Sequence, residues 1–288
     1  MYRPSRRHTT HLTPSLQRRL LPVLAALSTA LIGTLSAALS LPAHAANDAD
    51  LAKQLANPVA ALISVPVQLN FDREIGPARE GTRMTANIQP VVPFSFNADW
   101  NIISRTILPV VHQSDIFPGA GTQTGLGDVL QSVFFSPKAP GPGGVIWGVG
   151  PVFLIPTGTN SLLTADRWAA GPTAVALRQT GHWSYGILAN HLWSMGGGSG
   201  RDINQTFLQP FVSYIAGGGW TFGMNLEASR DWEREQWSVP INFSASKLLK
   251  VGNQMLSVGA GVGYWMESPE SGPHGWRFRA VVTWLFPK

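Results

Sequence analysis

The last thirteen residues of the chain, WRFRAVVTWLFPK, place two kinds of side chain on the two faces of an extended segment. Trp276, Phe278 and Trp284 fall on one face, whereas Arg277 and Arg279 fall on the other. Aromatic rings at both ends of an apolar face are typical of a strand that crosses a bilayer, because amphipathic rings favour the membrane interfaces. In hydrocarbon every backbone polar group must be paired within the protein, so such strands occur in closed barrels.

Similar alternation recurs along the chain in about twelve segments of roughly ten residues, separated by turn-forming residues. It is clean over 84–94, 220–229 and 237–246, whereas 146–155 and 184–193 are apolar or small on both faces. An even number of such strands is typical of a bacterial outer-membrane barrel. The sequence therefore predicts an all-β fold, a transmembrane antiparallel β-barrel of about 12 strands with a short N-terminal helix. The segments centre near 59–70, 83–95, 98–110, 126–136, 144–156, 167–179, 182–193, 204–215, 219–230, 236–247, 253–266 and 275–286.

The connections between these segments give a second signal, because tight and long connections mostly alternate. The tight ones are 96–97, 180–181 and 216–219, and the long, polar ones are 72–82, 112–124, 157–166, 194–203 and 267–274. Short periplasmic turns and long outer loops produce this alternation in a membrane barrel. The Pro-Gly-rich connection at 136–143 breaks the rule, and we interpret it as a rigid turn. We interpret Gly125 and Gly127 as a tight entry into the fourth strand, with Asp128 near its start.

The alternative fold is a soluble β-sandwich or lectin-like barrel, whose buried face would also alternate. Such a fold does not explain why tryptophan caps the segments rather than filling their middles. Tryptophans near proposed segment ends are Trp100, Trp168, Trp183, Trp193, Trp220, Trp237, Trp265, Trp276 and Trp284.

Residues 1–45 have the pattern of an export signal, with five arginines and no acidic residue, an apolar run over 20–41 and an A-x-A site at 43–45. An uncleaved membrane anchor is the alternative. The whole chain has 21 basic and 16 acidic residues. Removal of the five arginines leaves equal numbers, so the charge indicates no nucleic-acid partner. The chain contains no cysteine, which excludes disulfides and thiolate metal sites.

Residues 48–56 have early acidic residues and helical apolar spacing, and Asn57-Pro58 ends the pattern. We therefore expect a short periplasmic helix or lead-in within 46–58, followed by the barrel over 59–288. The helix could plug the lumen or merely cap the barrel, and the sequence leaves both readings open.

Two stretches, LAKQLANPVAALISVPVQLNFD (51–72) and TGLGDVLQSVFFSPK (124–138), carry a more specific signal. They resemble a family of bacterial outer-membrane proteins described as "MetA-pathway of phenol degradation" proteins or as transporters. The resemblance extends over nearly all of the chain after the signal. It implies a transmembrane barrel for small, often aromatic or hydrophobic compounds, and it carries over no catalytic or binding motif. Further matches are RTILPV (105–110), GPVFLIPT (150–157), NQTFLQPFVSY (204–214), WSVPINFSASKLLK (237–250) and LFPK (285–288).

A lipid hydrolase would need a serine, a histidine and an orienting polar group close together at the membrane interface. The segment His112-Gln113-Ser114-Asp115 has such residue types, and so do Asn190, His191 and Ser194. Adjacent strand residues point to opposite faces, so Asn190 is badly placed to orient His191. We expect no enzyme, no cofactor and no metal site, and we interpret 230–235 as a solvated outer loop of mixed charge.

Any selectivity of such a barrel resides in side chains that face its lumen. Charge inside a membrane protein is costly unless it faces water or a partner, so the charged candidates either line a pore or pair across a packed interior. We hypothesise that Glu227 with Arg277 and Arg279 forms a mixed-charge constriction. The lumen candidates are Asn87, Gln89, Arg105, Gln131, Asn225, Glu227, Arg277 and Arg279.

The sequence favours an outer-membrane channel or transporter for passive passage of small, aromatic or hydrophobic molecules. A closed structural or surface-interaction barrel is the first alternative, and an outer-membrane lipid hydrolase is the second. We expect the outer membrane of a Gram-negative bacterium as the location, with both chain ends in the periplasm. The expected partners are outer-membrane lipid, a small-molecule substrate and the barrel-assembly machinery.

Overall fold

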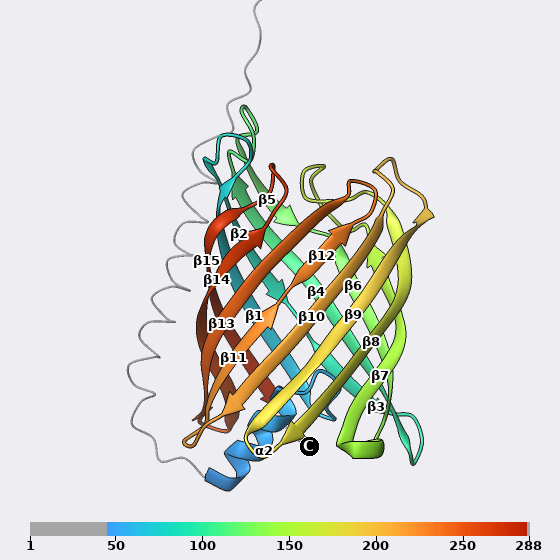
Figure 1. Cartoon of the computed structure of the whole chain (residues 1–288), viewed down its shortest axis with the longest axis vertical. Coiled ribbons are helices and arrows are strands. Elements are labelled where there is room, and N and C mark those ends of the chain that lie inside the picture. The colour runs from blue at the N-terminus through green and yellow to red at the C-terminus, as the bar shows by residue number, and fades with distance from the viewer. Residues whose placement is uncertain (1–44, 287–288) are drawn as a thin grey trace, which may run out of the picture. The chain divides into compact units, whose positions relative to one another are not determined.

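The computed structural model of the chain describes residues 45–286, so the predicted signal lies almost entirely outside the described residues. These residues form a closed antiparallel β-barrel of 12 transmembrane strands with one short helix (Figure 1), as the sequence predicts. Fifteen strand segments make up these 12 strands, and pairing of β9 with β10 closes the barrel. The elements are α2 (Ala45–Leu55), β1 (Ile63–Ile75), β2 (Gly81–Ile88), β3 (Val91–Ser95), β4 (Trp100–Ser114), β5 (Thr122–Leu126), β6 (Val129–Pro137), the 3-10 turn η2 (Pro142–Gly144), β7 (Val145–Ile155), β8 (Trp168–Thr180), β9 (Trp183–Gly196), β10 (Asn204–Ile215), β11 (Trp220–Leu226), β12 (Ala228–Asp231), β13 (Gln236–Val251), β14 (Gln254–Glu267) and β15 (His274–Phe286).

Three of the 12 strands are each split into two segments, and each split lies beside a proline. The split between β2 and β3 contains Pro90 itself. The split between β5 and β6 faces Pro109, whose carbonyl accepts the Gly127 amide, and the split between β11 and β12 faces Pro240, whose carbonyl accepts the Glu227 amide. Proline lacks an N–H group and leaves a gap in a sheet ladder, which weakens the pairing at these three splits, although Pro151, Pro172 and Pro210 lie within strands that stay continuous.

The connections separate into two sets at the two ends of the barrel (Figure 1). One end, here named the loop end, carries the connections 76–80, 115–121, 156–167, 197–203, 232–235 and 268–273. The opposite turn end carries 96–99, 138–144, 181–182, 216–219 and 252–253. Ile63 of β1 pairs with Phe286 of β15, so the first strand begins and the last strand ends at the turn end.

The strands are longer at the loop end than the sequence predicts. We expected 72–82 and 112–124 to be loops, but β1 continues to Ile75, β2 begins at Gly81 and β4 continues to Ser114. Asp128 does not start a strand either, since β5 precedes it. These residues look like loop residues because they are polar, but Asp72 and Gln113 are buried in the barrel interior.

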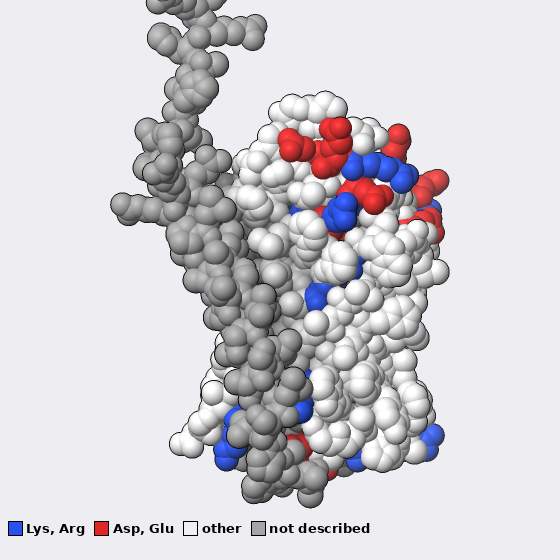
Figure 2. Space-filling view, turned by 90° about the vertical axis from the view of Figure 1, so that its left-hand side faces the viewer, with Lys and Arg blue, Asp and Glu red and all other residues white. Residues whose placement is uncertain are grey.

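The outer surface has the apolar belt that a lipid environment requires. The space-filling view shows charged residues gathered toward the two ends, with a mostly uncharged belt between them (Figure 2). Trp276 and Phe278 are exposed on the outer face of β15, and Arg277 beside them is 6% exposed. At the turn end the Lys247 ammonium lies 5.3 Å from the Trp220 ring centroid. An outward lysine beside an interfacial tryptophan is typical of a membrane boundary.

The interior has a polar side and an apolar side. We name the inward face of β6–β9 the apolar wall, where Phe134, Val175, Leu188 and Val152 are buried. We name the inward face of β1, β2 and β11–β15 the polar wall, which contains Asn70, Asp72, Asn242 and Arg277 among its buried residues.

The N-terminal segment fills the turn end of the barrel. Leu51 and Ala52 of α2 pack with Ile215, Leu248 and Leu285, which belong to strands β10, β13 and β15. Val59 joins the apolar wall, since it packs with Ile103 and Phe134. The Lys53 carbonyl accepts the Gln179 side-chain amide at 2.9 Å. Of the helices in residues 45–286, none is long and apolar enough to cross a membrane.

Candidate functional site

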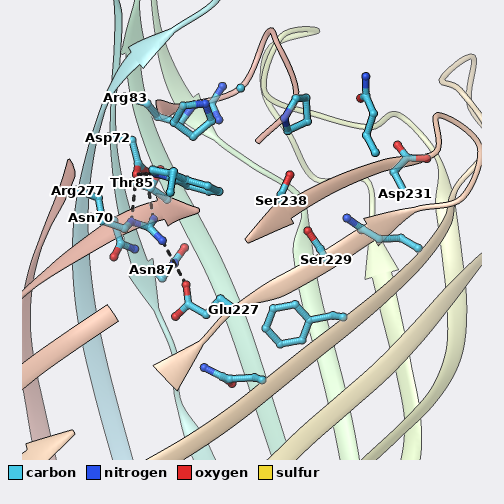
Figure 3. Close-up of a pocket in the computed structure, with 18 of the residues that line it drawn as sticks. Asn70, Asp72, Arg83, Thr85, Asn87, Glu227, Ser229, Asp231, Ser238 and Arg277 are labelled. Carbon is cyan, nitrogen blue, oxygen red and sulfur yellow. Dashed lines mark hydrogen bonds and ion pairs between the residues drawn. The ribbon is translucent and has the colours of Figure 1, made fainter. Parts of the chain in front are cut away.

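A cavity of about 740 Å³ lies inside the barrel along the polar wall and reaches toward the loop end. Its lining combines the polar wall with residues of β10 and of the 268–273 loop. Figure 3 shows Asn70, Asp72 and Asn87 on one side of this space and Ser229 and Ser238 on the other. The volume is in the range of small-molecule sites.

A charged cluster crosses the cavity wall and is here named the ion-pair cluster: Asp72, Glu227, Arg277 and Arg279. Arg277 Nε lies 3.0 Å from Asp72 Oδ1, and Arg277 Nη1 lies 3.3 Å from Glu227 Oε2 (Figure 3). Arg279 Nη2 donates to both Glu227 oxygens at 2.9 and 3.0 Å, and its Nε donates to Asn70 Oδ1 at 2.7 Å. Each carboxylate therefore contacts at least one guanidinium, as buried charges require.

The neighbouring aromatic ring completes the surroundings of this cluster. Trp265 on β14 donates its indole N–H to Asp72 Oδ1 at 2.8 Å. The Arg277 guanidinium lies 4.9 Å from the centroid of the same ring, a cation–π distance. Trp265 is thus an inward-facing residue that lines the cavity, which corrects the sequence-based reading of it as an interfacial cap.

Glycine on strand β14 leaves room for the long arginine side chains. Gly259, Gly261 and Gly263 alternate with apolar residues and face inward. A Cβ on Gly263 would lie 2.7 Å from Arg277 Cγ and 2.6 Å from Asn242 Oδ1. A side chain at Gly263 would therefore occupy the space that Arg277 crosses. Added carbons at Gly259 and Gly261 would instead collide with Ser246 and Phe243 of β13.

Arg83 on β2 lines the same cavity but has a different kind of partner. Its Nε donates to Gln113 Oε1 at 2.9 Å, and Gln113 is 1% exposed. The Gln113 amide nitrogen donates in turn to Gln123 Oε1 at 3.1 Å and lies 3.4 Å from the Leu162 carbonyl oxygen. Gln123 donates to the Ala120 carbonyl at 2.6 Å. A chain of buried amides therefore holds one edge of the Arg83 guanidinium in place.

The eight lumen candidates occupy three kinds of position. Four of them line the cavity: Asn87, Gln89, Glu227 and Arg277. Three more face the interior through bonds to other inward residues. Arg105 donates to Gln89 at 3.1 Å, Asn225 accepts from Asn242 at 2.9 Å, and Arg279 belongs to the ion-pair cluster.

Gln131 is the exception, because the inward position predicted for it is wrong. It lies on the same face of β6 as the exposed Phe135, whereas the neighbouring Phe134 is fully buried in the interior. On that outer face Gln131 accepts from Thr106 Oγ1 at 2.6 Å and donates to Ser104 Oγ at 3.0 Å. The three polar side chains satisfy one another, which reduces the cost of a polar group on an apolar surface.

Sequence reasoning missed most of the cavity lining, and Arg83, Asp72 and Trp265 are the missed residues on which the geometry described above depends. Arg83 has the same parity as Thr85, Asn87 and Gln89, so the period-two pattern could have included it. Asp72 was assigned to a loop because the strand end was placed too early. Trp265 carried no distinguishing signal, because the sequence alone does not separate an inward tryptophan from an interfacial one.

The residues considered for lipid hydrolysis do not converge in the structure. Asn190 is an inward residue of β9, and His191 beside it faces outward and contacts Thr206 Oγ1 at 2.7 Å. Ser194 has the parity of Asn190 and donates no bond to His191; its Oγ accepts from the Ile203 amide at 2.6 Å. His112 contacts Thr124 Oγ1 at 2.7 Å.

No family model matches the chain, and no curated protein matches it significantly. Among solved structures, the barrel is similar to an outer membrane channel from Pseudomonas putida F1, with a TM-score of 0.62 and 15% identity over 78% of this chain and 96% of that chain. It also aligns with the KdgM porin, solved with disordered oligogalacturonate, at a TM-score of 0.46 and 12% identity over 78% of this chain and 99% of that one. At these identities the first likeness shows the fold alone, and the second is too weak to add to it. The fold is that of an outer-membrane β-barrel.

Proposed function

We propose that this chain is an outer-membrane channel that lets small molecules pass along the polar wall. The observation that carries the proposal is the cavity of about 740 Å³ inside a closed membrane-type barrel, open to the loop end and lined by side chains that bind water or solute. A barrel with no transport role has no need for this cavity, because its interior could be packed throughout as the apolar wall is.

The proposal assigns the loop end to the outside and the turn end to the periplasm. Short turns on the periplasmic side and longer outer loops are the rule for such barrels. Both ends of the described chain would then lie in the periplasm. Aromatic or hydrophobic solutes, which the family resemblance implies, are the first substrates to try.

The N-terminal segment 46–58 is the part of the proposed path that most limits flow. It packs on inward-facing residues of three strands at the turn end. We therefore expect a low or intermittent conductance with the segment in place and a larger, steadier conductance without it.

Planar-bilayer recording of the refolded barrel tests this function. Two forms are compared, residues 46–288 and residues 59–288, each first shown to be folded by heat-modifiable migration in gel electrophoresis. Current steps in either form support a channel. If both forms are folded and neither carries current, the channel function is wrong.

A matched pair of substitutions on one helix controls for effects of the truncation other than removal of the packed segment. Leu51→Glu places a charge in the buried cluster beneath α2, whereas Gln54→Glu places the same charge on the exposed side of that helix. We expect the first to raise conductance toward that of the truncated form. The second should behave like the unaltered chain.

A closed structural barrel is the second candidate function, and the packing of α2 against Leu248 and Leu285 favours it. In that case the segment stabilises the barrel instead of gating it. Truncation would then lower the midpoint of denaturant-induced unfolding and produce no current.

A further inference from the structure

The charges that face the interior around the cavity do not balance. The strands supply four guanidinium groups, from Arg83, Arg105, Arg277 and Arg279, and two carboxylates, from Asp72 and Glu227. At the rim, Asp231 pairs with Arg234, so that pair adds no net charge. The strands that line the proposed path therefore carry an excess of two positive charges, and the exposed Arg201 adds another at the rim.

The excess resides on two particular arginines. Arg277 and Arg279 contact both carboxylates of the ion-pair cluster. Arg83 and Arg105 instead donate to the amide oxygens of Gln113 and Gln89. An amide oxygen accepts a hydrogen bond without cancelling charge, and within residues 45–286 neither guanidinium has a carboxylate at ion-pair distance, although Asp72 stands opposite Arg83 in the pairing of β1 with β2.

Arg83 is also oriented for binding. Gln113, itself bonded to Gln123, accepts from its Nε, and within residues 45–286 no hydrogen bond occupies the two terminal nitrogens of the guanidinium. A guanidinium edge with parallel N–H groups matches a carboxylate bidentately. Thr85 and Ser238 offer hydroxyls in the same lining, and Ile107 and Phe207 offer apolar contact for an organic group.

We propose that the cavity binds small organic carboxylates, with Arg83 as the residue that captures the anion, and that the channel favours anions over cations. The inference rests on the proposed function only for its second clause, because binding needs no conducting pore. Arg105 lies deeper, beside Gln89, and supplies the second unneutralised charge along the path.

Calorimetric titration of the refolded barrel in detergent tests the binding clause with butyrate, butylammonium and butanol, three probes of similar size and different charge. We expect butyrate to bind at least about tenfold more tightly than the other two, the scale of one charge-assisted hydrogen bond. Arg83→Gln should abolish that preference. Arg178→Gln, which removes an exposed arginine from the outer face of β8, should leave it unchanged.

Equal affinities for the three probes, or a butyrate preference that survives in Arg83→Gln, would overturn the assignment of Arg83. A loss of the preference in Arg178→Gln would also overturn it, because the effect would then be one of overall charge. Gel migration and circular dichroism of each variant establish that the barrel is folded before titration.

Reversal potentials across a salt gradient test the selectivity clause. A unit charge about 10 Å away in water raises the occupancy of one ion and lowers that of the opposite ion about twofold each, so we expect the chloride-to-potassium permeability ratio to fall about fourfold in Arg83→Gln. Adding Gln89→Glu, which gives Arg105 a carboxylate partner, should lower it about fourfold again. The steps should shrink in molar salt, where screening is short-ranged.

The two proposals fail in different ways. If neither the 46–288 form nor the 59–288 form carries current when folded, the channel function is contradicted. The butyrate titration then still tests whether Arg83 binds a carboxylate. Current with a cation preference, or with a preference that ignores Arg83→Gln, contradicts the anion path and leaves the channel standing.

Discussion

The polar wall and the apolar wall share the same outer surface but differ in what they place inside. Both present apolar and aromatic side chains to the outside, as Phe278 on β15 and Phe153 on β7 illustrate. Inside, the polar wall carries charges and amides around a cavity, whereas the apolar wall closes on Phe134, Val175 and Leu188. The lipid requires apolar side chains on the outer face of each strand. The polarity of the inner face depends on whether water or packed protein lies next to it.

This difference explains why polar and apolar residues alternate regularly in some segments of the sequence and not in others. The clean alternation over 84–94, 220–229 and 237–246 falls on strands of the polar wall and their continuations. The segments that are apolar or small on both faces, 146–155 and 184–193, form β7 and β9 of the apolar wall. A strand that is buried inside and faces lipid outside has no polar side to reveal its period.

Removing Arg277 should produce the largest effect on the polar wall. In Arg277→Gln, Asp72 loses its guanidinium partner and Glu227 retains only Arg279. Leaving a buried charge without its partner costs about 3 kcal/mol. Denaturant unfolding of the barrel in detergent measures the loss, with Arg178→Gln as the exposed control. A cost similar to that of the control would mean that water, not Arg277, solvates Asp72.

On the apolar wall the sensitive position is a glycine. A Cβ on Gly150 of β7 would collide with the carbonyl oxygen of Val133 on β6. Overpacking of this kind costs about 2 kcal/mol. Gly150→Ala should therefore lower the free energy of unfolding, while Gly217→Ala, in an open turn with nothing within 4 Å of the added carbon, should not. Equal stability of the two variants would show that β6 and β7 shift to accommodate the added carbon at little cost in free energy.

Most of the fold could be predicted from the sequence, because the membrane imposes a period and a strand length. The 12 strands, the N-terminal helix and the alternating connections are confirmed. The strand ends at Asp72 and Gln113 could not be predicted, because a polar residue at a strand end is identical in sequence to a loop residue. Only the partners Arg277 and Arg83 reveal that both side chains are inside.

The site could be predicted less completely. Parity placed Asn87, Glu227 and Arg277 on the inner face, and it failed at Gln131 because no clean alternation fixes the phase of β6. The pairing of Arg277 with Asp72 joins residues 205 positions apart. Single-sequence patterning carries no information at that range, so which arginines are neutralised became visible only in the folded barrel.

A smaller effect is expected where the loop end joins the apolar wall. Asp128, at the split between β5 and β6, accepts from the Gly158 amide at 3.0 Å, the Thr164 hydroxyl at 2.7 Å and the Ala165 amide at 2.6 Å. Asp128→Asn weakens these charge-assisted bonds and should cost about 1 kcal/mol. Denaturant unfolding checks this value, with Asp115→Asn in a neighbouring loop as the control. If Asp128→Asn left the free energy of unfolding unchanged, the bonds between Asp128 and the 156–167 loop would contribute nothing to the stability of the barrel.

The smallest effect concerns the contact between the 156–167 and 197–203 loops above the apolar wall. Asp166 Oδ2 accepts from the Ser199 hydroxyl at 2.6 Å and from its amide at 2.9 Å, and these bonds lower the pKa of the Asp166 carboxyl below its usual value. A lowered folded-state pKa means that the contact contributes stability above the unfolded pKa and loses it as pH falls through the folded pKa. We expect the hydrogen-exchange protection of the Ser199 amide to be constant near neutral pH and to fall in acid below the ordinary aspartate range. In Asp166→Asn the acid-dependent step should disappear, whereas in Asp202→Asn, whose carboxylate does not contact Ser199, it should remain. A step that persists in Asp166→Asn would assign the acid sensitivity of this rim to another titrating group.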